Sequence, residues 1–181
     1  MKDDFIVPLD GLAQGRTEFR RSVGKEFFEH FENSEILDAS LGVSVIIDKS
    51  GRYIGIDCDI EGYVTVTCDR CLGDLRLPVD TGFFLDVRFG EPDPVSGEGP
   101  DEDPESGRET VYLPPASSEM DLAQAVYDYV CLSLPVQRVH EEGGCDPETV
   151  RYLNSEDGQE PVRKDSSTPF AGLKDLLGKI E

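Results

Sequence analysis

Two short motifs supply most of the side chains in this sequence that bind transition metals well. Cys68 and Cys71 form a C-x-x-C pair, and His140 and Cys145 form an H-x4-C pair. Two residues between the thiols let both sulfur atoms face one point, while the amides of the turn donate to the thiolates. Three thiolates and one imidazole make a closed ligand set that is typical of structural zinc. The sequence therefore predicts one zinc ion held by these four residues.

The interval between the two motifs indicates what such an ion would connect. Sixty-eight residues separate Cys71 from His140, which is too many for a small zinc finger. The first pair follows a predicted strand, and the second follows a helix end marked by Pro135. Gly143 and Gly144 give the chain the freedom to bring both ligands of the second pair to the ion. We expect the ion to pin the end of a strand to the segment after the helix.

Two other interpretations of these residues stay open. Cys68 and Cys71 are also spaced like a thioredoxin-type redox pair, which would make the protein a thiol-redox enzyme. Such a pair usually opens a helix, whereas residues 72–75 lead here into another predicted strand. Unligated thiols beside a surface histidine are the third interpretation. The remaining cysteines and histidine are interpreted as structural residues: Cys58, Cys131 and His30.

Motifs of common enzymes are missing from the chain. Gly24-Lys25 is followed by Glu26, which does not fit a P-loop, and neither G-x-S-x-G nor H-E-x-x-H occurs. With two histidines, one of them a predicted ligand, a general base is scarce. The N-terminus has no signal-peptide pattern, and no run approaches the ~18 apolar residues of a membrane span. We expect a cytoplasmic binding protein without a membrane or small-molecule partner and without catalytic residues.

The charge of the chain restricts its macromolecular partners. Seventeen basic residues against 38 acidic ones give a net charge of −21. Most of such a surface repels a phosphate backbone, so the acidity suits either a basic protein partner or simple solubility. A single small basic cluster is the candidate for nucleic-acid contact: Arg16, Arg20, Arg21 and Lys25.

The elements that must position the metal ligands are mostly strands. Residues 1–90 alternate apolar and polar positions between short turns, which predicts an antiparallel meander. A short helix is predicted over 24–33, where three aromatic residues recur at helical spacing. The predicted strands cover residues 5–7, 41–48, 53–60, 63–67, 75–79 and 83–89, with a turn at 61–62.

The second half of the chain contains one predicted long helix and two polar stretches. Residues 91–109 hold eight acidic residues, four prolines and three glycines, so we expect a disordered acidic loop there. Residues 118–134 repeat apolar positions at helical spacing, with Ser118 and Asp121 as candidate N-caps. Residues 169–180 predict a short amphipathic helix that either docks on the domain or binds a partner.

These features together predict an α+β fold. Its β-rich antiparallel meander domain carries one long helix, a short C-terminal helix and a zinc-pinned strand end. We assign residues 1–153 to a single domain that includes the acidic loop 91–109. Residues 154–181 are assigned to a polar linker and the C-terminal amphipathic helix.

An ordered set of four motifs resembles the YceD-like family, the large ribosomal RNA subunit accumulation proteins. The motifs are V-T-V-T-C-x-x-C at 64–71, D-L at 121–122, L-x-L-P-V-x-x-V-H-x4-C at 132–145 and P-F-x-x-L at 169–173. The resemblance implies a bacterial cytosolic protein, or a plastid relative, needed for normal accumulation of large-subunit ribosomal RNA. It implies no catalytic residues, and the metal assignment rests on the spacing alone.

Two classes of function follow from these observations. The first is a non-enzymatic ribosome-biogenesis factor that binds a basic large-subunit ribosomal protein or precursor rRNA. The net charge of −21 favours the protein partner, because phosphate contact needs a local basic patch. The second is a thiol-redox enzyme that uses Cys68 and Cys71.

Overall fold

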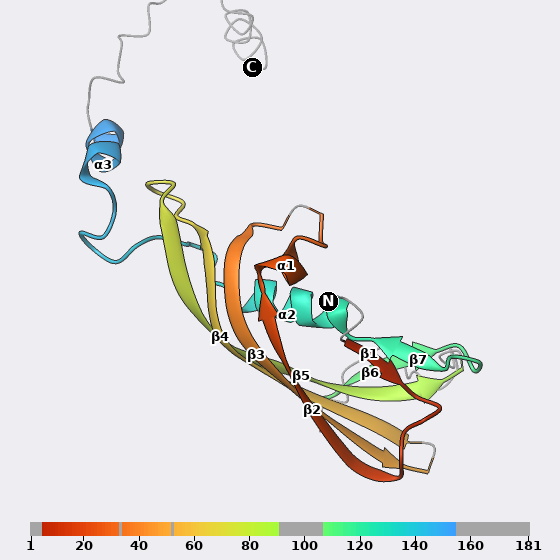
Figure 1. The fold of residues 1–181 in the computed structure, drawn as a ribbon. Helices are drawn as coiled ribbons and strands as arrows, with labels where there is room; N and C mark the ends of the chain where they lie inside the picture. Colours follow the sequence, from red (N-terminus) through yellow and green to blue (C-terminus); the bar gives the residue numbers. More distant parts are fainter. Residues whose placement is uncertain (1–4, 33, 52, 91–106, 155–181) are drawn as a thin grey trace, which may run out of the picture.

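A five-stranded sheet forms the body of the protein in the computed structural model, which describes residues 5–32, 34–51, 53–90 and 107–154 (Figure 1). The strand order is β2-β3-β4-β5-β6. The first four strands form an antiparallel meander, and β6 joins β5 in parallel. The strands are β2 (Gly15–Gly24), β3 (Ile36–Ser50), β4 (Tyr53–Thr67), β5 (Asp74–Phe89) and β6 (Glu109–Leu113).

A second layer covers one face of this sheet. It consists of α1 (Lys25–Phe28), α2 (Ala123–Ser133) and a small antiparallel pair made of β1 (Ile6–Pro8) and β7 (Glu119–Asp121) (Figure 1). A third helix, α3 (Pro147–Asn154), follows the second predicted ligand pair. Among the described residues, no helix combines the length and apolar character needed to cross a membrane.

Period-two alternation on the long strands produces the core. Every second residue of β4 from Ile54 to Ile60 is buried, and Val64 and Val66 continue the row. Phe28, Leu122 and other apolar residues of the second layer pack on these side chains. Fully burying a side chain of this size contributes about 1.5–3 kcal/mol, so this interface holds the two layers together.

The predicted α+β class is confirmed, and three details of the prediction are corrected. The segments 53–60 and 63–67 are one strand, β4, and the segments 75–79 and 83–89 are one strand, β5. The two strands pair without a break from Ile54↔Val87 to Thr67↔Asp74, so residues 61–62 do not turn the chain. Gly62 has φ +144 and a Cβ there would lie 2.2 Å from the Ser40 carbonyl oxygen, so this glycine permits a close approach of strands.

The long helix predicted over 118–134 is not confirmed, because α2 begins only at Ala123. Residues 119–121 pair instead with β1, and the Ser118 carbonyl accepts a hydrogen bond from Leu9 N–H at 2.8 Å. The short helix predicted over 24–33 is limited to α1. The predicted C-terminal helix over 169–180 lies outside the described residues.

The sheet is also not purely antiparallel, because the end of the predicted acidic loop is ordered. Residues 91–106 of that loop lie outside the described residues, but Glu109 begins β6. Arg108 holds this position: its guanidinium donates to Asp57 at 2.7 Å, to Asp86 at 2.6 Å and to the Leu85 carbonyl at 3.1 Å. An arginine shared by two strands therefore fixes the parallel strand at the sheet edge.

Replacing Arg108 with Ala should lower the free energy of unfolding by about 1–3 kcal/mol, because two partly buried carboxylates lose their partner. The side chains of Arg108 and Asp86 are 20% and 19% exposed, so solvent screens this network only in part. Thermal denaturation would measure the loss. Arg16→Ala, at an exposed position on β2, serves as the matched control and should change stability by less than about 0.5 kcal/mol. Equal melting temperatures for the two variants would contradict the role given to Arg108.

Candidate metal centre

The C-x-x-C pair occupies the tight connection between β4 and β5. Cys68 N–H donates to the Gly73 carbonyl at 2.8 Å, and Leu72 N–H donates to the Cys68 carbonyl at 3.0 Å. Leu72 has φ 59, a left-handed conformation that closes the turn. Cys68 is fully buried and Cys71 is 9% exposed. The turn therefore presents both sulfur atoms toward the interior at the end of the sheet.

Two hydrogen bonds between Asp69 and Arg138 bring the second motif to this turn. Asp69 N–H donates to the Arg138 carbonyl at 2.7 Å, and Arg138 N–H donates to the Asp69 carboxylate at 2.7 Å. The Arg138 guanidinium also pairs with Glu35 at 2.5 Å, which ties the segment to the chain just before β3. The segment after α2 is thus fixed alongside the β4–β5 turn, two residues before His140.

The four predicted ligands converge on one point. The ligand atoms of Cys68, Cys71, His140 and Cys145 all lie within 4.8 Å of one another, a group that could hold a metal ion. The Cys68 and Cys145 sulfur atoms are 3.9 Å apart, and His140 Nδ1 lies 3.4 Å from Cys71 Sγ and 3.7 Å from Cys145 Sγ. Tetrahedral zinc, with bonds of about 2.3 Å to sulfur and about 2.0 Å to nitrogen, requires separations of about 3.5–3.8 Å. The donor set and its spacing fit such an ion.

A second contact orients the histidine ring toward this point. The Asp74 carbonyl oxygen lies 3.0 Å from His140 Nε2 and accepts its hydrogen, which leaves Nδ1 facing the sulfur atoms. The hydrogen bond to Asp74 is also the main cause that raises the pKa of His140. Partners of this kind fix the tautomer and orientation of histidine ligands in metal sites.

The surroundings of the C-x-x-C pair favour thiolates. Burial alone raises the pKa of the Cys68 thiol, but hydrogen bonds from the backbone amides of Cys71, Arg70 and His140 lower it to about 6. Amides of Asp146 and Gly73 likewise lower the pKa of Cys71. The thiolate is the form that binds metal, so these amides favour metal binding by the C-x-x-C pair, whereas burial raises the pKa of Cys145.

The residues predicted to be structural lie outside this group. Cys58 is fully buried, and burial raises its pKa to about 12, so it remains a neutral core thiol. Cys131 lies in α2, and burial raises its pKa as well. His30 Nδ1 lies 2.5 Å from the Glu26 carbonyl. The C-x-x-C pair itself leads from strand to strand rather than into a helix, which favours metal binding over redox chemistry.

Sequence reasoning missed the element that follows Cys145. Asp146 accepts hydrogen bonds from Thr149 N–H at 3.2 Å and Thr149 Oγ1 at 2.7 Å, and so caps the start of α3. The signal was present in the sequence as an Asp followed by Pro147 at the first helical position. This cap fixes the direction in which the chain leaves the last ligand.

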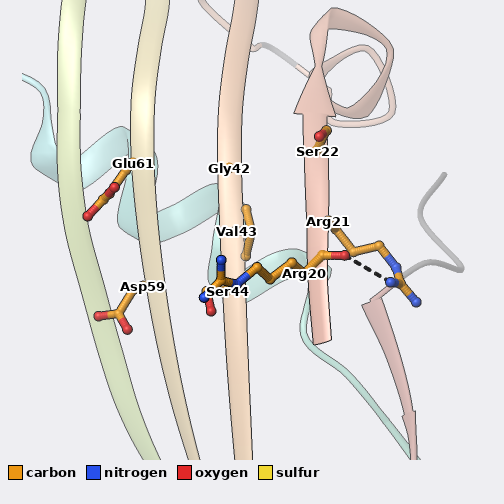
Figure 2. A pocket seen from close by; sticks show the side chains of 8 residues that line it. All are labelled: Arg20, Arg21, Ser22, Gly42, Val43, Ser44, Asp59 and Glu61. Atoms are coloured by element: carbon orange, nitrogen blue, oxygen red, sulfur yellow. Dashed lines mark hydrogen bonds between the residues drawn. The ribbon is translucent and has the colours of Figure 1, made fainter. Parts of the chain in front are cut away.

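The four basic residues predicted to contact nucleic acid lie on two elements, β2 and α1. Arg16, Arg20 and Arg21 lie on the edge strand β2, where alternation sends Arg20 and Arg21 in opposite directions (Figure 2). Arg20 pairs with Glu18 at 3.0 Å, and the Arg21 guanidinium lies 5.2 Å from the Phe19 ring centre. Lys25 begins α1 and lies 3.5 Å from the carboxylate of Glu29. These four residues are thus divided between β2 and the start of α1, and nucleic-acid contact through them stays a prediction.

Replacing Asp69 with Ala should weaken metal binding by about 10-fold without removing a ligand, because substitutions behind metal ligands cost 10–100-fold in affinity. The variant loses the carboxylate that holds Arg138 N–H and with it the position of the His140 segment. Competition with a chromophoric chelator would measure the change. Asp48→Ala, at an exposed position on β3, is the matched control. Unchanged affinity in Asp69→Ala would show that the segment is positioned by other contacts.

These features define a class: an α+β protein with a curved sheet, one face of which is covered, and a Cys₃His group that could hold a metal ion at the sheet end. The chain belongs to the family described as large ribosomal RNA subunit accumulation protein YceD, whose sequence profile matches residues 56–177. The match covers more than half of the chain and includes all four residues of the group. No curated protein sequence and no solved structure matches the chain.

Proposed function

We propose that this protein is a non-enzymatic cytoplasmic assembly factor that supports the accumulation of large-subunit ribosomal RNA. Membership of the YceD family is the observation that carries this proposal, since the family description names accumulation of an RNA and no reaction. The closed set of four possible ligands supports a structural role for a bound metal, because catalytic sites keep a coordination position open.

We further propose that the ion is zinc, held by Cys68, Cys71, His140 and Cys145. Zinc binds sulfur and imidazole donors well, and its filled d shell imposes no coordination geometry of its own. The ion would join the β4–β5 turn to the segment after α2, two parts of the chain that also meet through Asp69 with Arg138 and through Asp74 with His140. The zinc ion would then fix the end of the sheet, a structural role that requires no reaction at the metal.

The partner that suits this protein is a basic large-subunit ribosomal protein. The net charge of −21 opposes contact with a phosphate backbone, and the basic residues of β2 are divided between its two sides. An acidic surface can occupy the basic surface of such a protein before that surface meets rRNA. Precursor rRNA, contacted through Arg16, Arg20, Arg21 and Lys25, is the second candidate.

Rescue of depleted cells tests the assembly role. Depletion of the protein should lower the ratio of large-subunit to small-subunit rRNA, and the wild-type chain should restore it. Cys145→Ser should restore it poorly, whereas Cys131→Ser, which changes a cysteine outside the metal group, should restore it fully. An unchanged rRNA ratio after depletion would refute the proposal.

A thiol-redox enzyme is the alternative, favoured by the low pKa of Cys68. It predicts that Cys68→Ser fails to restore the rRNA ratio and that the pure wild-type protein contains no zinc.

A further inference from the structure

One face of the sheet carries none of the described helices (Figure 1). We call it the bare face; it is made by the outward residues of β2 to β5. Three large aromatic side chains stand on it with nearly half of their surface exposed: Tyr53 at 46%, Tyr63 at 47% and Phe84 at 45%. Tyr53 begins β4, Tyr63 lies ten residues further along the same strand, and Phe84 pairs with Asp57 between them, so the exposed rings are spread along the bare face.

This face already holds two guanidinium groups of the chain itself. The guanidinium of Arg76 lies 4.1 Å from the ring centre of Tyr63, and that of Arg108 lies 5.8 Å from the ring centre of Phe84. Arg108 is also paired with Asp57 and Asp86. Aromatic rings next to carboxylates are the surroundings that a planar guanidinium prefers. The bare face is therefore chemically suited to arginine.

A hollow of about 540 Å³ opens beside these groups, between β2, β3 and β4 (Figure 2). Gly42 and Ser44, which have small side chains, line the hollow on the middle strand β3. The carboxylates of Asp59 and Glu61 line it on β4. Among the described residues, neither carboxylate has an ion pair or a hydrogen bond, because Arg20, which also lines the hollow, pairs with Glu18 instead. The lining residues are Arg20, Arg21, Ser22, Gly42, Val43, Ser44, Asp59 and Glu61.

One glycine beside the hollow, Gly82, cannot easily be enlarged. Gly82 of β5 lies directly beside Asp59, and a Cβ there would come within 2.5 Å of the Cys58 carbonyl oxygen. A side chain at this position would force the two strands apart. The space next to the Asp59 carboxylate is thus kept open by the packing of β5 on β4.

We propose that the bare face is the docking surface for an extended arginine-rich segment of a protein partner. Its guanidinium groups enter the hollow between Asp59 and Glu61 and lie beside the exposed aromatic rings. This inference rests on the proposed function, since it assigns to the basic ribosomal protein a place on the sheet. Arginine is favoured over lysine because its planar group both pairs with carboxylates and stacks on rings.

A labelled oligoarginine peptide and an oligolysine peptide of equal length are the probes, and fluorescence anisotropy with the full chain gives their dissociation constants. Asp59→Asn/Glu61→Gln should raise the dissociation constant for oligoarginine by about 10-fold, since each exposed charge pair contributes up to ~1 kcal/mol. Asp10→Asn/Glu32→Gln makes the same charge change at exposed positions off the sheet and should change it less than about 2-fold. Ser44→Arg, which fills the hollow, should weaken binding like the first variant.

Equal effects of the two double variants would overturn the docking surface, because binding would then depend on net charge alone. Tighter binding of oligolysine than of oligoarginine would overturn it as well. In depleted cells, full restoration of large-subunit rRNA by Asp59→Asn/Glu61→Gln would overturn the surface and leave the assembly role intact. Failure of the wild-type chain to restore that rRNA would refute the assembly role, and the peptide measurement would still decide the surface.

Discussion

Replacing Cys71 or Cys145 with Ser should reduce the zinc content of the purified protein well below one ion per chain and lower its melting temperature. Both sulfur atoms belong to the group whose ligand atoms lie within 4.8 Å of one another, so loss of either opens the closed set. The remaining three donors cannot complete a tetrahedral site from the protein alone. Metal analysis of the pure variants beside the wild type measures the first effect.

The thermal effect should be large but should not abolish folding. Structural zinc supplies on the order of 10 kcal/mol to small peptides, whereas here the buried core between the sheet and the second layer shares the stabilisation. If the ion contributes about 3 kcal/mol, the melting temperature falls by about 6–12 °C for a chain of this length. Cys131→Ser, outside the metal group, is the matched control and should keep its zinc. A ligand variant that retains full metal and stability would exclude the four-residue site.

The second large effect concerns association with the partner. Binding to a basic ribosomal protein should slow by about 10- to 100-fold when salt rises from low to physiological concentrations and above, because charge steering raises association rates by 10–10³. The net charge of −21 supplies the field, and at physiological salt the Debye length is only about 8 Å. Stopped-flow measurements over a salt series would follow the association rate.

Dissociation provides the internal control for this prediction. Steering acts before contact, so the dissociation rate should depend on salt far less than the association rate does. An association rate that stays constant across the series would mean that the acidity of the chain serves solubility rather than recognition.

The group of four possible metal ligands could be predicted from the sequence, because the types and the spacing of its residues are those of known metal sites. The C-x-x-C pair indicates half of a metal site, and the H-x4-C pair supplies the other two donors. The spacing does not predict the contact that joins the two ligand pairs. The hydrogen bonds between Asp69 and Arg138 link residues far apart in the chain and carry no local pattern.

Strands were predicted where burial alternates strongly and missed where it does not. β3, β4 and β5 bury most of one face and therefore show a clear period of two. β2 reads as GRTEFRRSVG, and as an edge strand it is exposed along most of both faces, so its sequence resembles a polar loop. β6 and β7 are short and exist only through partners distant in the sequence.

Turn and helix boundaries failed for physical reasons that are visible in the structure. Glu61-Gly62 resembles a turn, but both neighbouring strands continue to pair beside it, so the glycine allows close strand contact instead. The apolar residues before Ala123 have helical spacing, but residues 119–121 form a strand that pairs with β1 instead of extending α2. Alternation on β2 likewise divided the basic residues that sequence proximity had grouped.

Crosslinking in cells, followed by separate recovery of RNA and protein, tests the central claim most directly. We expect crosslinks between the bare face and a basic large-subunit ribosomal protein, and their loss in Asp59→Asn/Glu61→Gln. Abundant direct crosslinks to large-subunit rRNA that disappear when Arg16, Arg20, Arg21 and Lys25 become Ala would contradict the protein partner and place the RNA itself on β2.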